Sequence, residues 1–98
     1  MQRHHKDSEM INQDTVLQMS RKFRLQWEES QQKHVLLYAE GMVQLNDSAT
    51  EILQLCDGKR SVQDIINILQ NKFQEDNVQS DVMTFLAEAI DKGWIVAQ

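Results

Sequence analysis

The chain has 98 residues, of which 41% are hydrophobic and 26% are charged, values typical of one small globular domain. Ten Lys and Arg residues against fifteen Asp and Glu residues give a net charge of −5, which opposes non-specific binding to nucleic acid and anionic lipid. The composition therefore excludes a two-domain enzyme and argues against polyanionic partners.

The first twenty residues are polar, and their few apolar side chains keep no sustained period. We therefore expect residues 1–20 to form a flexible arm outside the core and residues 21–98 to form the domain. No signal-peptide pattern follows Met1, and no apolar run reaches the ~18 residues that span a bilayer. We expect a cytoplasmic protein that does not bind membranes.

Three strands are expected next. Phe23, Leu25 and Trp27 alternate with polar residues, the period-2 pattern of a strand with one buried face. The predicted strands are residues 21–28, 34–39 and 42–45. Gly41 lies in the tight turn between the last two strands, where hairpins commonly need a positive φ.

The period becomes helical after residue 45, and three helices are expected. They run from Asn46 to Gly58, from Ser61 to Phe73 and from about Ser80 to Gly93. Ser61 and Asp64 have the spacing of a capping box, and Gly58 and Gly93 are expected as left-handed helix ends. Residues 94–96 are expected to close over the core.

Three strands followed by three helices predict an α+β domain, because helices this short must cover one another and one sheet face. The order fits a winged helix-turn-helix with a three-stranded antiparallel sheet followed by three helices. Domains of this shape can place a helix in the major groove of DNA. The third helix, however, carries Asp81, Glu88 and Asp91 against Lys92, so we expect it to repel phosphates.

Few residues are suited to catalysis. Two of the three histidines, His4 and His5, lie in the expected arm, where a metal site would lack fixed geometry. Cys56 is the single cysteine, and its place on the apolar stripe of a helix favours a buried thiol over a reactive one. We therefore expect no enzyme activity, no metal and no cofactor.

The third helix and the last strand favour a peptide-binding groove. Met83, Ala87 and Ile90 widen the apolar arc of the helix on one side only, and an uncovered edge strand offers free N–H and C=O groups to an added strand. The predicted groove is formed by Met42, Val43, Gln44 and Leu45 facing Met83, Leu86, Ala87 and Ile90. The alternative is that Met83 and Ile90 pack against the first strands or Trp94.

Several motifs resemble those of the PqqD family of pyrroloquinoline quinone biosynthesis proteins. They are FRLQWEE, the run from HVLLYAEGMVQLND to CDGKRSV, and DVMTFLAEAIDKGWI, which together extend over about residues 21 to 96. Ala39 and Gln74 stand where the family frequently has proline. The resemblance implies a non-catalytic peptide chaperone that binds the precursor peptide PqqA and presents it to the radical S-adenosylmethionine enzyme PqqE. It also implies that the peptide adds as a strand between the third strand and the third helix.

A basic group of residues is a candidate docking site for the enzyme. Arg21, Lys22, Arg24 and His34 lie in an otherwise acidic domain and are suited to steering an acidic partner; ordinary solvated strand charge is the alternative. Two further functions stay open: a carrier of the quinone or an intermediate, stacked on Trp94 or Tyr38, and a winged-helix transcription regulator. A monomer and a swapped homodimer both fit the sequence.

Overall fold

The computed structural model of this chain describes residues 11–74 and 77–98. Its elements, in chain order, are β1 (Val16–Met19), β2 (Arg24–Glu28), β3 (Lys33–Tyr38), β4 (Gly41–Gln44), α2 (Asp47–Gln54), β5 (Asp57–Ser61), α3 (Val62–Phe73), α4 (Val78–Asp91) and β6 (Ile95–Ala97). Within the described part, two three-stranded antiparallel sheets and three helices confirm the predicted α+β class. The winged helix-turn-helix arrangement is compatible with this architecture and stays a prediction.

The first sheet has the strand order β2-β3-β4 and contains the three strands that were predicted. Leu25 pairs with Leu36, and Leu36 pairs with Val43. Because side chains alternate along a strand, these three residues share one face, and Leu36 is fully buried there. Gly41 has a φ of 153° at the end of the β3–β4 turn, so its predicted positive φ is confirmed.

The second sheet, with the order β5-β1-β6, was not predicted. Its central strand is β1, and Leu17 in this strand has an exposed fraction of 0%. Ile11 is also buried. The expectation that the chain up to Ser20 stays outside the core is therefore wrong for residues 11–19. β1 is held in place by pairing with β5 and β6, which are distant in the sequence. Its own residues therefore show no local pattern that predicts a strand. Residues 1–10, with His4 and His5, lie outside the described residues.

The chain after α2 also differs from the prediction. α2 ends at Gln54 with Leu55 as its C-cap, and Gly58 lies inside β5 instead of ending the helix. Its φ is 80°, and an added Cβ would lie 3.1 Å from the Gln18 side chain on β1. Pairing with β1 therefore requires a glycine in β5, while Cys56 just before it is buried and free, as predicted.

The remaining helix ends follow local rules. The Ser61 hydroxyl accepts from the Asp64 N–H at 3.1 Å, and the Asp64 carboxylate accepts from the Ser61 N–H, which confirms the capping box. α3 ends at Phe73, followed by Gln74 in the left-handed conformation. α4 starts two residues earlier than predicted, at Val78.

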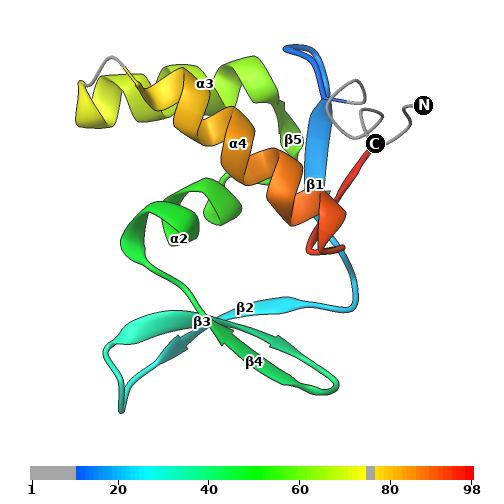
Figure 1. Cartoon of the computed structure of the whole chain (residues 1–98), viewed down its shortest axis with the longest axis vertical. Helices are drawn as coiled ribbons and strands as arrows, with labels where there is room; N and C mark the ends of the chain where they lie inside the picture. Colours follow the sequence, from blue (N-terminus) through cyan, green and yellow to red (C-terminus); the bar gives the residue numbers. More distant parts are fainter. Residues whose placement is uncertain (1–10, 75–76) are drawn as a thin grey trace.

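Figure 1 shows the β2–β3–β4 sheet at one end of the molecule, with α2 between it and the pair α3 and α4. β1 and β6 lie beside α4 at the other end. The buried side chains of these elements form one cluster, which includes Leu17, Leu36, Leu53, Ile65, Ile66, Leu69, Leu86 and Ile95. In the described residues, no helix is both long enough and apolar enough to cross a membrane.

Candidate functional site

β4 is an edge strand of the first sheet. In the described part of the chain it pairs only with β3, so one of its two sides has no strand partner there. Met42 has an exposed fraction of 49%, which is high for a large apolar side chain. This side of β4 is a candidate site for an added strand.

The register shows which backbone groups are free. The Leu45 N–H donates to the His34 C=O at 3.2 Å, so the pair of these two residues is hydrogen-bonded. Antiparallel pairs alternate between bonded and non-bonded, and the β3–β4 register is regular. Val43 therefore bonds to β3, whereas the N–H and C=O groups of Met42 and Gln44 point away from the sheet.

The side chains of the predicted β4 wall divide between two faces. Leu45 is buried, and Val43 packs against the core cluster. Met42 and Gln44 lie on the opposite face and are exposed, and the Gln44 amide donates to the Gln31 side chain at 2.7 Å. The contribution of β4 to a groove is thus its backbone edge and the Val43 side chain, while Leu45 supports them from the core.

The orientation of α4 decides which of its residues face β4. Asp81 lines a pocket together with Ser48 and Ile52 of α2, so the Asp81 side of α4 is turned toward α2. At 100° per residue, Phe85, Glu88 and Lys92 share this side of the helix. In Figure 1, α2 and the β2–β3–β4 sheet both lie below α4.

Met83, Ala87 and Ile90 lie on the opposite side of α4, about 180–240° from Asp81 on the helical wheel. Met83 and Ala87 line a hollow with Ile11 of the N-terminal segment. A groove between β4 and Met83, Ala87 and Ile90 stays a prediction. The predicted place of Leu86 in this groove is wrong, because its exposed fraction is 0% and its side chain packs in the core.

Phe85 on α4 and Trp94 just after its end form an aromatic pair. Their ring centroids are 6.3 Å apart, and the Lys92 ammonium lies 6.0 Å from the Trp94 ring centre. Both aromatic residues are half-buried. Both residues also pack against the core cluster, and Phe85 shares its side of α4 with the polar residues Asp81 and Glu88.

The four residues predicted to dock the enzyme do not form one group. Arg21, Lys22 and Arg24 line a shallow hollow beside Tyr38. His34 lies on the other face of the sheet, because it pairs with Trp27 on β2 and its ring centroid lies 5.1 Å from the Trp27 ring. The basic cluster predicted from the sequence is therefore divided between two faces.

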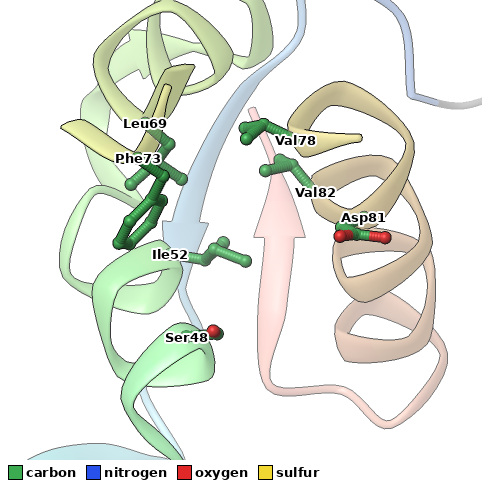
Figure 2. A pocket seen from close by; sticks show the side chains of 7 residues that line it. All are labelled: Ser48, Ile52, Leu69, Phe73, Val78, Asp81 and Val82. Atoms are coloured by element: carbon green, nitrogen blue, oxygen red, sulfur yellow. The ribbon is translucent and has the colours of Figure 1, made fainter. Parts of the chain in front are cut away.

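A separate apolar pocket lies between the three helices. Figure 2 shows Ile52 of α2, Leu69 and Phe73 of α3, and Val78 and Val82 of α4 around it. Ser48 and Asp81 add the polar groups of its lining. A neighbouring hollow shares Ser48 and Phe73 with this pocket and extends to Trp27 and His34. Together they form a continuous surface whose lining includes no residue of β4.

The titratable groups offer little for catalysis. Burial, together with the nearby Asp57 carboxylate, raises the pKa of Cys56 to about 12, so its thiol stays protonated at neutral pH. Across residues 11–74 and 77–98 there is no group of three His, Cys, Asp or Glu residues that could hold a metal ion. The arrangement is suited to binding another chain by strand addition.

Comparisons with known proteins agree with this class of binding module. Residues 33–95 match the family model PqqD, described as coenzyme PQQ synthesis protein D. A protein of Methylococcus capsulatus named PqqA binding protein is 42% identical over 87% of this chain and 91% of its own length. One of Azotobacter vinelandii with the same name is 51% identical over 82% of this chain and 88% of its own length.

A solved structure is also similar. It is the solution NMR structure of the PqqD truncation of Methylobacterium extorquens PqqCD, described as a functional, stand-alone recognition element for ribosomally synthesized and post-translationally modified peptides. The TM-score is 0.73 at 29% identity, over 92% of this chain and 98% of that one. The chain belongs to the PqqD family, which confirms the resemblance found in the sequence. The role of this family is binding, so the expected lack of enzyme activity is supported by its relatives.

Proposed function

We propose that this protein binds the precursor peptide PqqA and presents it to the radical S-adenosylmethionine enzyme PqqE in pyrroloquinoline quinone biosynthesis. The names of its relatives support the peptide as ligand. The observation that carries the proposal is the β4 edge, where the backbone groups of Met42 and Gln44 are directed away from the sheet. An extended peptide pairs with such groups regardless of its side chains.

Selectivity then comes from the side chains beside the edge. Val43 on β4 and the half-buried pair Phe85 and Trp94 are the apolar and aromatic side chains that we assign to this role. Aromatic side chains bury a large area at a small entropic cost, which makes them frequent anchors at interfaces. Lys92 beside Trp94 adds a cation that favours an acidic residue in the bound peptide.

The two alternative functions gain no support from the described residues. Tyr38 already contacts Phe23 in a tilted arrangement, with ring centroids 5.2 Å apart, and Trp94 contacts Phe85, so both rings already have an aromatic partner. Asp81 and Glu88 lie on the exposed part of α4, where they would repel DNA phosphates. Neither alternative is therefore proposed.

An NMR titration of the labelled protein with synthetic PqqA peptide tests the peptide site. We expect the largest shifts at the Met42 and Gln44 amides and at the Trp94 indole N–H, and small shifts at Met83 and Ala87. Shifts confined to Met83 and Ala87 would place the peptide on the opposite side of α4 and reject the proposed groove. The presentation step is tested by comparing peptide cross-linking by PqqE with and without this protein; equal rates reject it.

A further inference from the structure

A second exposed surface lies at the edge of the first sheet that is opposite to β4. We call it the Trp27–Phe73 surface, after its two largest side chains, whose exposed fractions are 46% and 40%. Its residues line the two adjoining hollows described above, and they are Trp27, His34, Asp47, Ser48, Thr50, Glu51, Ile52, Gln54, Leu69, Phe73, Val78, Asp81 and Val82. Large exposed apolar side chains that adjoin a pocket are typical of protein interaction sites.

The aromatic part of this surface is held in a fixed position. The Trp27 indole N–H donates to the Glu29 carboxylate at 3.0 Å, and the His34 ring meets the Trp27 ring edge to face at a centroid distance of 5.1 Å. A side chain that is already oriented loses little entropy on binding. Trp27 is therefore exposed and preorganised, which suits it to anchor a partner.

The apolar pocket beside it accepts a side chain of moderate size. Its floor is formed by Ile52, Leu69 and Val82, which belong to three different helices (Figure 2). Each of these residues is buried and part of the core cluster, so the floor is rigid. An aliphatic side chain placed here is removed from water, with a stabilisation of roughly 25 cal/mol per Å².

The Asp and Glu residues that line the surface give it an acidic character. The lining residues include the carboxylates of Asp47, Glu51 and Asp81 and no lysine or arginine. Lys72 reaches Glu51 at 2.5 Å and lies 5.9 Å from the Phe73 ring centre, so one carboxylate is compensated. Within the described part of the chain, Asp47 and Asp81 have no such salt bridge. This pattern attracts a cationic partner.

The position of the surface allows two partners to bind at once. Trp27 lies on β2 and the proposed peptide edge lies on β4, with β3 between them. Neighbouring strands are ~4.8 Å apart, so a peptide paired with β4 does not cover β2. A presenting protein needs two such separate surfaces, one for the peptide and one for the enzyme.

We infer that the Trp27–Phe73 surface is the docking site for the partner enzyme, through a segment that carries an apolar side chain next to a lysine or arginine. This inference rests on the proposed function. The apolar side chain enters the pocket between the helices, its aliphatic neighbours cover Trp27 and Phe73, and the cation pairs with Asp47 or Asp81. It replaces the basic docking site predicted from Arg21, Lys22 and Arg24.

Isothermal titration calorimetry of purified PqqE and of PqqA peptide against the same variants tests the inference. Trp27→Ser and Phe73→Ser each remove one exposed aromatic, and Ile68→Ser is their matched control, since Ile68 is an exposed apolar residue of α3 outside both hollows. Asp81→Asn removes one carboxylate, and Asp91→Asn on the same helix is its control. Circular dichroism melts of all variants verify that they fold.

We expect Trp27→Ser and Phe73→Ser to weaken PqqE binding at least tenfold, and Asp81→Asn to weaken it severalfold, with PqqA affinity and both controls unchanged. Normal PqqE affinity in folded Trp27→Ser overturns the inference. If these variants lose affinity for PqqA and keep their affinity for PqqE, the inference is also overturned, because the surface is then a peptide site. If the wild-type protein forms a concentration-dependent dimer that Trp27→Ser abolishes, the surface binds a second copy of the chain and the inference is overturned as well. If the wild-type protein binds PqqE and not PqqA, the proposed peptide function fails while this docking site stands.

Discussion

The backbone N–H of Leu45 donates to the C=O of His34 at 3.2 Å, and this bond sets the phase of the whole β3–β4 ladder. It assigns Val43 to the bonded positions and Gln44 to the free ones. Two neighbouring residues of one strand therefore have different tasks. Val43 holds the sheet together, and Gln44 offers its backbone to an added strand.

Proline substitutions separate these two tasks. Gln44→Pro removes an N–H that points away from the sheet, so we expect near-normal stability and at least tenfold weaker PqqA binding. Val43→Pro removes a ladder bond to β3, so we expect a loss of about 3 kcal/mol or more in the free energy of unfolding. Urea titration measures the stability, and calorimetry measures the binding.

Gln44→Ala is the matched control, because it removes the side chain and keeps the backbone N–H. Its PqqA affinity is expected to stay within about twofold of the wild-type value. A folded Gln44→Pro variant with the same affinity as Gln44→Ala would reject strand addition at β4.

Truncation of Leu17 measures the contribution of β1 to the core. Leu17 is fully buried in the centre of the second sheet, and Leu→Ala changes in cores typically cost 2–5 kcal/mol. We expect Leu17→Ala to fall in this range in urea titration, and Asp14→Ala, at an exposed position, to change stability by less than about 0.5 kcal/mol. A loss below about 1 kcal/mol for Leu17→Ala would contradict the burial of β1.

The left-handed end of α3 predicts a stabilising substitution. Gln74 has a φ of 55°, a conformation that is unfavourable for residues with a Cβ by roughly 1–2 kcal/mol. Gln74→Gly removes this strain, and part of the gain is offset by the larger backbone entropy of glycine in the unfolded chain. We expect a melting temperature that is a few degrees higher in calorimetry.

Gln74→Pro gives the opposite result, because the proline ring fixes φ near −65°. Equal melting temperatures for the glycine and wild-type proteins would show that Gln74 is not strained.

The pKa of Cys56 predicts a loss of stability in alkaline solution. Burial is the main reason that the pKa is raised from 9.0 to about 12. The folded state therefore keeps the thiol proton at a pH where the unfolded chain has released it, and the free energy of unfolding falls as the pH rises from 9 to about 12. Each pH unit in this window costs up to about 1.4 kcal/mol.

Denaturation curves of the wild-type protein and Cys56→Ala, recorded across this pH range, isolate the effect, because all other groups titrate in both proteins. The difference between the two is expected to shrink as the pH rises. Parallel curves would mean that the thiol ionises equally in the folded and unfolded states.

The predictable parts of the fold are those that local sequence determines. The alternation around Leu25 and Trp27 indicated β2, and the spacing of Ser61 and Asp64 indicated the start of α3. β1 and β5 escaped prediction because their residues are held by pairing with distant strands. β5 in particular has the sequence DGKRS, which contains no apolar residue and therefore no period.

The candidate site, like the fold, was predictable only where local sequence determines the structure. The turn at Gly41 and the short strand after it indicated an edge, and the structure has this edge. Local sequence does not determine which side of α4 is turned toward this edge, because α4 is apolar over much of its circumference and its rotation depends on packing. Ile11 lines the same hollow as Met83 and Ala87, although it lies more than seventy residues away from them in the sequence.

The pairing of β1 with β6 has a mechanical consequence. The Gln98 N–H donates to the Val16 C=O at 2.9 Å, and the two strands are antiparallel, so the start of one lies beside the end of the other. Tension applied between these two points breaks the hydrogen bonds between β1 and β6 one after another, instead of loading all of them at the same time. A translocating protease that pulls on either strand from this end would therefore meet little mechanical resistance to the first step of unfolding.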